Sequence, residues 1–190
     1  MPRPAGTRDG FPRWRVYAAV GVALVAVIGV IVGARIVSNR PDTSVDDPLP
    51  LAGVEAPGAA TPACTALMAA LPAELGGQPR RQLQHADDPS LVGAAAWGEP
   101  PVVLRCGIPT PAELTCTAAV QEVDGVAWLP LSTGGDTTYF AVDRSVRIAL
   151  TVPEEVTSTG PWQEASTVIA ATLPERDICQ GGVPLPADGE

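Results

Sequence analysis

The sequence predicts an α+β fold: an N-terminal transmembrane helix, then a small domain with an antiparallel sheet of four or five strands and two flanking helices. Three observations predict it. An uncharged apolar run near the N-terminus is long enough to cross a bilayer, short strand-like segments gather between residues 101 and 152, and a helical pattern lies on each side of them. Strands that follow one another between helices favour an antiparallel sheet covered on one face by both helices.

A single transmembrane helix is expected within residues 16–37. From Val16 to Ala34 the chain has nineteen residues without a charge, which as a helix would span about 28 Å. Four arginines precede it, so residues 1–15 are expected in the cytoplasm and the rest of the chain outside the cell membrane. A cleaved signal peptide ending at Ala34 is the alternative. The apolar run exceeds the usual length for a signal peptide, which favours a retained signal anchor.

The remaining chain divides by composition into three parts. Residues 38–60 are rich in proline and lack apolar periodicity, which is typical of an extended linker that would hold a domain roughly 25 to 30 Å from the membrane. Residues 61–180 form the expected exported domain. Residues 181–190, with the sequence GGVPLPADGE, are expected to be a disordered tail.

All four cysteines lie in the exported part, and an even number in an oxidising compartment indicates two disulfides. Of the three pairings that are possible, we favour Cys64 with Cys106 and Cys116 with Cys179. They would close loops of about 42 and 63 residues and contribute on the order of 4 kcal/mol each. Zinc binding is the alternative, but the CxxC spacings are absent and the single histidine, His85, lies in a polar stretch, so we expect no metal and no cofactor.

The exported domain is expected to begin with a helix and a strand. Thr61 and Pro62 have the character of an N-cap and a first-turn proline, and the apolar residues that follow recur at helical spacing as far as Pro72. A polar stretch, residues 76–89, comes next. The apolar, β-branched run Pro101–Cys106 then predicts a strand.

Two hairpins and a second helix complete the predicted domain. The pair Asp124-Gly125 separates two alternating segments, which is the strongest short-range signal for a hairpin. A second hairpin is predicted from residues 137–142 and 146–152, in which Arg147 alternates with the apolar positions. The final helix is predicted to start at Thr159-Gly160-Pro161 and to end at Pro174.

Charge and motifs exclude several classes of function. After Ile36 the chain holds seven arginines against twenty acids, so a net charge near -13 argues against binding to nucleic acids. No nucleophile elbow, P-loop, HExxH or SxxK motif is present, and the chain has no lysine. A catalytic triad would have to use His85, whose neighbours Asp87 and Asp88 are more simply turn formers before Pro89.

A resemblance to a known family rests on one dense segment and three shorter ones. The segment from Ala95 to Pro111, AAWGEPPVVLRCGIPTP, with Cys64-x-x-Leu67, Leu71-Pro72 and Asp124-Gly125-Val126-x-Trp128, resembles domain of unknown function family 3515. It covers about residues 61–175. It implies a membrane-anchored or exported envelope protein of high-GC Gram-positive bacteria, and it implies the pairing of Cys64 with Cys106. Cys116 and Cys179 look like an addition to the family's usual pair of cysteines. The family supplies no catalytic residues.

One group of side chains suggests a ligand pocket. Aromatic faces and guanidinium groups in an acidic domain could hold an anionic or sugar-containing ligand. The group consists of Arg80, Arg81, Trp97, Arg105 and Trp128. The competing interpretation is tryptophans packed in the core and arginines paired with acids.

The leading functional hypothesis is a non-enzymatic, membrane-anchored module of unknown activity that binds an envelope protein or a cell-wall component. We assign no catalytic residues. The alternative is an envelope hydrolase or transferase that uses a pair of carboxylates. A third hypothesis is a structural subunit whose membrane helix, Val16 to Ala34, is itself the binding element beyond its contact with the lipid bilayer.

Overall fold

The structure, a computed structural model, describes residues 47–189, which fall within one compact unit, Ser44–Glu190. The expected cytoplasmic segment 1–15, the expected transmembrane helix within 16–37 and the first part of the expected linker lie outside the described residues. Among residues 47–189 no helix is both long and apolar enough to span a bilayer.

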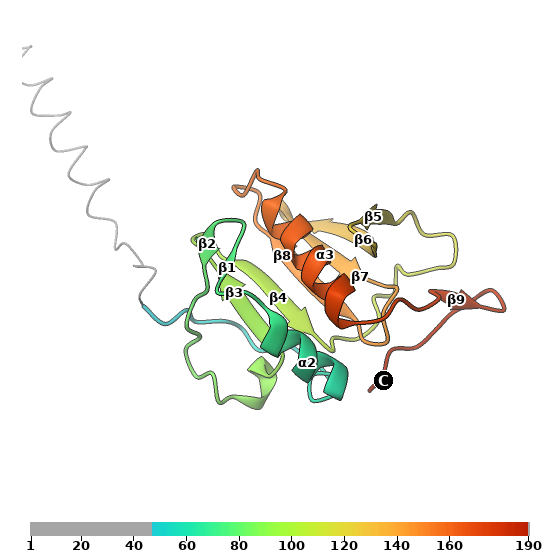
Figure 1. The fold of residues 1–190 in the computed structure, drawn as a ribbon, viewed down its shortest axis with the longest axis horizontal. Coiled ribbons are helices and arrows are strands. Elements are labelled where there is room, and N and C mark those ends of the chain that lie inside the picture. Colours follow the sequence, from blue (N-terminus) through green and yellow to red (C-terminus); the bar gives the residue numbers. More distant parts are fainter. Residues whose placement is uncertain (1–46, 190) are drawn as a thin grey trace, which may run out of the picture. The chain divides into compact units, whose positions relative to one another are not determined.

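A six-stranded antiparallel sheet forms the centre of the domain (Figure 1). Its strand order is β3-β4-β8-β7-β6-β5, so β3 and β5 are the two edges. The strands are β3 (Ala94–Trp97), β4 (Val102–Cys106), β5 (Gln121–Val123), β6 (Val126–Thr133), β7 (Asp136–Ala141) and β8 (Ile148–Val152). The α+β fold class is confirmed, and the sheet has six strands where four or five were predicted. The additional strand is β3, whose four residues are all buried and therefore show no alternation.

Both predicted helices are present and cover the same face of the sheet (Figure 1). Helix α2 runs over Pro62–Ala70, and the Thr61 side chain accepts a hydrogen bond from the Cys64 amide as the predicted N-cap. Helix α3 runs over Gly160–Thr172. Between the helices and the sheet lies the main core, to which both helices and the inward residues of β3, β4, β6, β7 and β8 contribute.

The polar stretch after α2 also contains regular structure. Two short strands, β1 (Glu74–Leu75) and β2 (Gln78–Pro79), pair with each other, and a single turn of 3₁₀-helix, η1, spans Pro89–Leu91. The Arg81 amide donates to the Ala96 carbonyl and the Gly98 amide donates to the Pro79 carbonyl. These bonds cover part of the exposed edge of β3.

The second half of the expected linker packs on the domain instead of leaving it. We call residues 47–60 the N-terminal strap. Leu49 forms a parallel bridge with Leu83, and the Gly58 amide donates to the Gly107 carbonyl at 2.9 Å. At Gly107, which has a φ of +82°, an added Cβ would lie 2.1 Å from the Ala59 nitrogen, so only glycine permits this contact. The domain therefore begins near Asp47 and not near Thr61.

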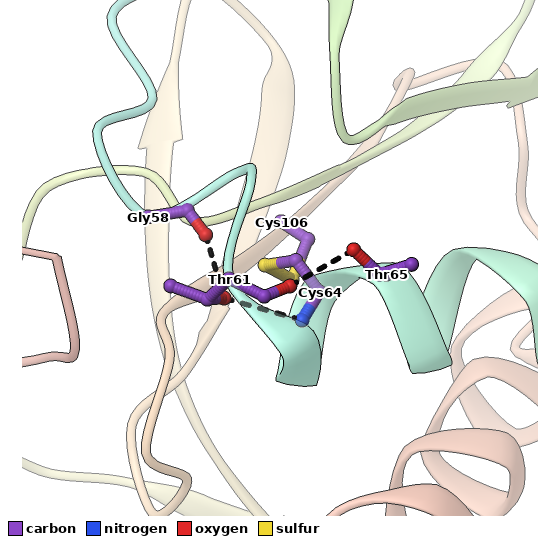
Figure 2. Close-up of a disulfide and its surroundings, with 5 residues drawn as sticks. All are labelled: Gly58, Thr61, Cys64, Thr65 and Cys106. Carbon is purple, nitrogen blue, oxygen red and sulfur yellow. Dashed lines mark hydrogen bonds between the residues drawn. A yellow bond between two sulfur atoms is a disulfide. The ribbon is translucent and has the colours of Figure 1, made fainter.

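Two disulfides join the pairs of cysteines that the sequence favoured: Cys64 with Cys106 and Cys116 with Cys179. The Cα atoms of the pairs are 5.6 Å and 5.8 Å apart. The first bond lies in the main core and ties α2 to β4 beside the Thr61 cap (Figure 2). The second ties the segment before β5 to strand β9 (Cys179–Gln180).

The C-terminal segment is ordered in the structure as far as Gly189, which replaces the expectation of a disordered tail. Strand β9 pairs with β10 (Val183–Pro184). The Leu185 amide then donates to the Ile178 carbonyl, and the Asp188 amide donates to the Ser145 carbonyl at 2.7 Å. These backbone hydrogen bonds, together with the burial of Ala187, hold the segment in place.

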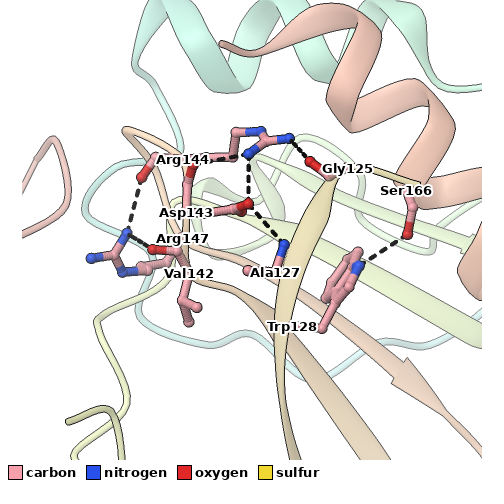
Figure 3. Close-up of polar contacts among 8 residues, drawn as sticks. All are labelled: Gly125, Ala127, Trp128, Val142, Asp143, Arg144, Arg147 and Ser166. Carbon is pink, nitrogen blue, oxygen red and sulfur yellow. Dashed lines mark hydrogen bonds and ion pairs between the residues drawn. The ribbon is translucent and has the colours of Figure 1, made fainter. Parts of the chain in front are cut away.

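Arg147 connects this segment to the rest of the domain. The alternation of residues 146–152 predicted that Arg147 faces away from the apolar core. Arg147 lies outside that core, but its side chain is buried as well, with 1% of its surface exposed. Its guanidinium donates to the carbonyl oxygens of Val142, Arg144 and Leu185, and its Nε donates to the Thr110 hydroxyl. One buried cation therefore holds the β7–β8 connection, the loop after β4 and the C-terminal segment together. Figure 3 shows its hydrogen bonds to Val142 and Arg144.

Removal of the core disulfide is expected to cost more stability than removal of the other. In a fragment of residues 44–190, Cys64→Ala with Cys106→Ala should lower the free energy of unfolding by more than the roughly 4 kcal/mol that loop closure predicts. Both sulfurs are fully buried, so their loss also leaves a cavity. Cys116→Ala with Cys179→Ala should lose only the loop term. Equal losses in guanidinium unfolding would contradict the packing contribution.

Arg147→Met is expected to destabilise the same fragment by about 3 kcal/mol, because three carbonyl oxygens, two of them in buried contacts, lose their donor. Arg176→Met is the matched control, since Arg176 is partly exposed and its Nη2 donates to a single carbonyl, that of Pro186. Urea unfolding measures both losses. Similar small losses in the two variants would show that the Arg147 contacts contribute little.

Candidate functional site

The two tryptophans of the suggested ligand pocket lie in the core. Trp97 and Trp128 are completely buried. The Trp97 indole nitrogen donates to the Pro72 carbonyl at 3.2 Å, and that of Trp128 donates to the Ser166 hydroxyl at 2.9 Å. No surface of either ring is left for a ligand, so the packed-core interpretation describes both.

The three arginines of that group contact different parts of the domain. Arg81 is buried and donates to the Glu99 carboxylate at 2.8 Å and to the carbonyls of Gly98 and Asp47. Arg80 lies 5.6 Å from the centre of the Trp97 ring. Arg105 extends to the opposite face of the sheet, where it donates to the Ala52 carbonyl and where partial burial lowers its pKa. The structure thus brings Arg80 and Arg81 to β3 but leaves Arg105 and Trp128 apart from them.

The surroundings of His85 are those of a turn. His85 is exposed, has a φ of +55°, and accepts a backbone hydrogen bond from Asp88. The Ser90 hydroxyl donates to the Asp88 carboxylate at 2.8 Å, and so does the Ser90 amide. These two bonds lower the pKa of Asp88, with a smaller contribution from His85. Because Asp88 holds the serine hydroxyl, the arrangement is the N-cap of η1, as the turn-former interpretation holds.

An acidic pocket lies near the β5 edge of the sheet, opposite the β3 edge. The sequence did not predict it. We call it the Asp143 pocket. Its volume is about 380 Å³. It is formed where the β5–β6 turn meets the segment that follows α3. The lining residues are Glu122, Gly125, Ala127, Asp143, Glu175, Arg176, Asp177, Ile178 and Cys179.

Asp143 is the buried acid of this pocket, with 5% of its surface exposed. Its Oδ2 accepts hydrogen bonds from the Ala127 amide and from Arg144 Nη1, both at 2.8 Å (Figure 3). Its Oδ1 is also buried but has no hydrogen-bond partner among the described residues. Burial raises the pKa of the Asp143 carboxyl, against the opposing effects of the Ala127 amide and the Arg144 charge.

The wall opposite the β5–β6 turn is held by backbone and disulfide bonds. The Arg176 amide donates to the Asp143 carbonyl at 2.9 Å, and Cys179 is bonded to Cys116. The Arg176 guanidinium is engaged with the C-terminal segment, where it donates to the Pro186 carbonyl at 2.9 Å and lies 3.9 Å from the Asp188 carboxylate.

The chemistry of the pocket is therefore that of an anionic cleft. Glu122, Glu175 and Asp177 are exposed around the buried Asp143. No cluster of three or more His, Cys, Asp or Glu residues suited to a metal ion occurs in the range 47–189. The signal that could have found the site is Asp143-Arg144 followed by Arg147, three charges within an otherwise apolar hairpin. Because these charges lie between two strand-like segments, the sequence predicts only a hairpin turn there.

Comparison with known proteins finds one family. A family described as "Protein of unknown function (DUF3515)" matches residues 20–178. No curated protein and no solved structure matches the chain.

The raised pKa of Asp143 predicts a specific pH dependence of stability. The folded protein holds this proton more tightly than the unfolded chain, so the contribution to stability is full below the ordinary aspartate pKa of about 3.9 and is lost as pH rises through the raised pKa. The difference in unfolding free energy between wild type and Asp143→Asn should therefore fall with rising pH in that window. Urea unfolding measures it, with the exposed Asp87→Asn as control. A difference that increases with pH would contradict the assignment.

Proposed function

The chain belongs to the DUF3515 family of proteins of unknown function, and from that premise we propose that it is a membrane-tethered binding module of the cell envelope. Its tether would be the apolar segment Val16 to Ala34, its binding surface would be the Asp143 pocket, and the domain would lie outside the cytoplasm. A surface with this excess of acids disfavours nucleic acid as a partner.

The observation that carries the proposal is the distance between two places in the domain: the point where the described chain enters it, and the pocket. The described chain enters at Asp47, whose carbonyl accepts from Arg81 at 3.0 Å beside the edge strand β3. The pocket is built on the turn between β5 and β6, at the opposite edge of the sheet. Neighbouring strands lie about 4.8 Å apart, so five spacings place roughly 24 Å of rigid sheet between the two. A domain tethered at one edge would present its pocket away from the attachment.

The N-terminal strap would also limit the reach of such a module. Because residues 47–60 pack on the domain, twelve residues separate Ala34 from Asp47. Fully extended, that length of chain reaches about 40 Å. The binding surface would then operate within a defined layer next to the membrane. Two disulfides and the buried Arg147 suit a rigid platform in an oxidising compartment.

One observation favours a second candidate function. Asp143 is a carboxyl of raised pKa at a cleft with Glu122, Glu175 and Asp177 nearby, which is the kind of group that glycoside-cleaving enzymes use as a general acid. An envelope hydrolase or transferase that pairs Asp143 with one of these acids would lose turnover in Asp143→Asn while it still binds substrate.

Site-specific photo-crosslinking in intact cells tests the tethered module. A crosslinker at position 122, on the pocket rim, should capture an envelope component that a crosslinker at the exposed Glu154 does not. The capture should persist when Val16 to Ala34 is exchanged for an unrelated anchor, because the exported domain carries the binding surface. Capture that requires the native helix, and is the same from both positions, would instead support the membrane helix as the binding element.

A further inference from the structure

We infer that strand β5 is a docking edge, at which an extended and basic segment of another polypeptide adds to the sheet as a further strand. The inference deepens the proposed function and rests on it in one respect, since Glu122 of β5 also lines the Asp143 pocket that the tethered module would present. It names the partner as a polypeptide and the contact as backbone pairing along the edge of the sheet.

The geometry of the β5–β6 hairpin directs the backbone of Glu122 out of the sheet. The turn Asp124-Gly125 has two residues, both with positive φ, so Val123 and Val126 form the hydrogen-bonded pair that closes the hairpin. In an antiparallel ladder the next pair exchanges no hydrogen bonds, and this pair is Glu122 with Ala127. The N–H and C=O of Glu122 therefore point away from β6.

The contacts of Ala127 confirm this orientation. Its amide donates to the Asp143 carboxylate at 2.8 Å (Figure 3), and its carbonyl accepts the Val142 amide at 3.0 Å. Both partners lie on the side of β6 away from β5. The backbone of Glu122 forms no hydrogen bond outside the hairpin with another described residue, and β5 is the last strand in the order of the sheet. A strand that lies along β5 can pair with both backbone groups.

Proline protects the other outward edges of the sheet. Strand β6 extends beyond β5, and its first outward residue there is Pro130, which has no N–H. At the opposite side the strap is the outermost segment, in which Leu49 makes the backbone hydrogen bonds and is flanked by Pro48 and Pro50. Such prolines hinder pairing with other chains. Because β5 contains no proline, it remains able to accept a strand.

The charge at β5 favours a basic partner and disfavours a second copy of the chain. Glu122 and Asp124 are exposed, as are Glu175 and Asp177 of the pocket, while Arg176 is engaged with the C-terminal segment. If β5 of two copies paired through Glu122, the two carboxylates would lie directly opposite each other, which destabilises a sheet. A lysine or arginine in that position is attracted instead.

The two sides of β5 define the pattern of the incoming strand. Val123 packs against the main core, whereas Glu122 faces the pocket. In a strand paired with β5, the residue opposite Glu122 lies on the pocket side, and its two neighbours lie on the core side. The sequence that fits is therefore a basic residue between two apolar ones.

Peptide binding to the full-length chain in phosphatidylcholine nanodiscs tests the inference. The probe is the fluorescein-labelled peptide Thr-Val-Lys-Val-Thr amide. One counterpart has glutamate in place of lysine, and the other carries a methyl group on the backbone nitrogen of the lysine, which keeps the charge but removes the donor. Fluorescence anisotropy should show saturable binding of the lysine peptide, and both counterparts should bind about tenfold more weakly or worse. Empty nanodiscs should bind none of the three.

Variants connect the binding to the edge. Glu122→Lys should reverse the preference, so that the glutamate peptide binds about threefold more tightly than the lysine peptide. Glu122→Pro removes the outward N–H, as Pro130 does in β6, and should weaken binding of the lysine peptide by about tenfold or more. Because Glu122→Pro can also disturb the hairpin, the reversal in Glu122→Lys is the decisive result. Glu154→Lys is the matched exposed control and should bind as wild type.

Three outcomes would overturn the inference. The methylated peptide could bind as tightly as the lysine peptide, which would indicate attraction between charges without strand pairing. Glu122→Lys could keep the wild-type preference. The chain could form a dimer that Glu122→Pro abolishes, which would assign the edge to a second copy. Failure of this titration is distinguishable from failure of the proposed function, because crosslinking from position 122 can capture an envelope component while the purified chain binds no strand.

Discussion

The burial of Arg147 is the constraint on which the rest of the structure depends. A guanidinium that is 1% exposed must have its N–H groups satisfied, and here three carbonyl oxygens of two chain segments and the Thr110 hydroxyl of a third segment satisfy them. Its own carbonyl accepts the Gly107 amide, and Gly107 in turn receives the N-terminal strap. The requirement of one buried charge thus joins the strap, the loop after β4 and the C-terminal segment around the end of the sheet.

The Asp143 pocket is a consequence of the same arrangement. The C-terminal segment that Arg147 anchors through Leu185 supports the wall formed by residues 175–179, and the Cys116–Cys179 bond holds that wall from the other side. Asp143 then lies between this wall and the β5–β6 turn, with one oxygen engaged and the other not. A buried acid with a raised pKa in a concave, acidic setting is a candidate for ligand recognition on physical grounds.

Two features stabilise the domain at different places: a disulfide in the core and a polar cluster outside it. The Cys64–Cys106 disulfide lies inside the apolar core between α2 and β4, where packing contributes as well as loop closure. The polar cluster around Arg147 lies outside that core and is held by hydrogen bonds to backbone carbonyls. The sheet carries the strap at β3 and the pocket at the β5–β6 turn, so the point where the described chain enters the domain and the pocket are separated by rigid structure.

Local signals in the sequence determined the two helices and the Asp124-Gly125 hairpin, and the resemblance implied the family and the pairing of Cys64 with Cys106. These follow from capping, turn chemistry and motifs within a few residues, and from a resemblance that rests on them. Only the tertiary structure decided that Trp97 and Trp128 are core residues, that β3 joins the sheet, and that the strap and the C-terminal segment are ordered. The physical reason is distance along the chain, since the hydrogen bond from Arg147 to Leu185 spans 38 residues. A local sequence pattern cannot indicate which distant carbonyl oxygen will accept a hydrogen bond from a buried arginine.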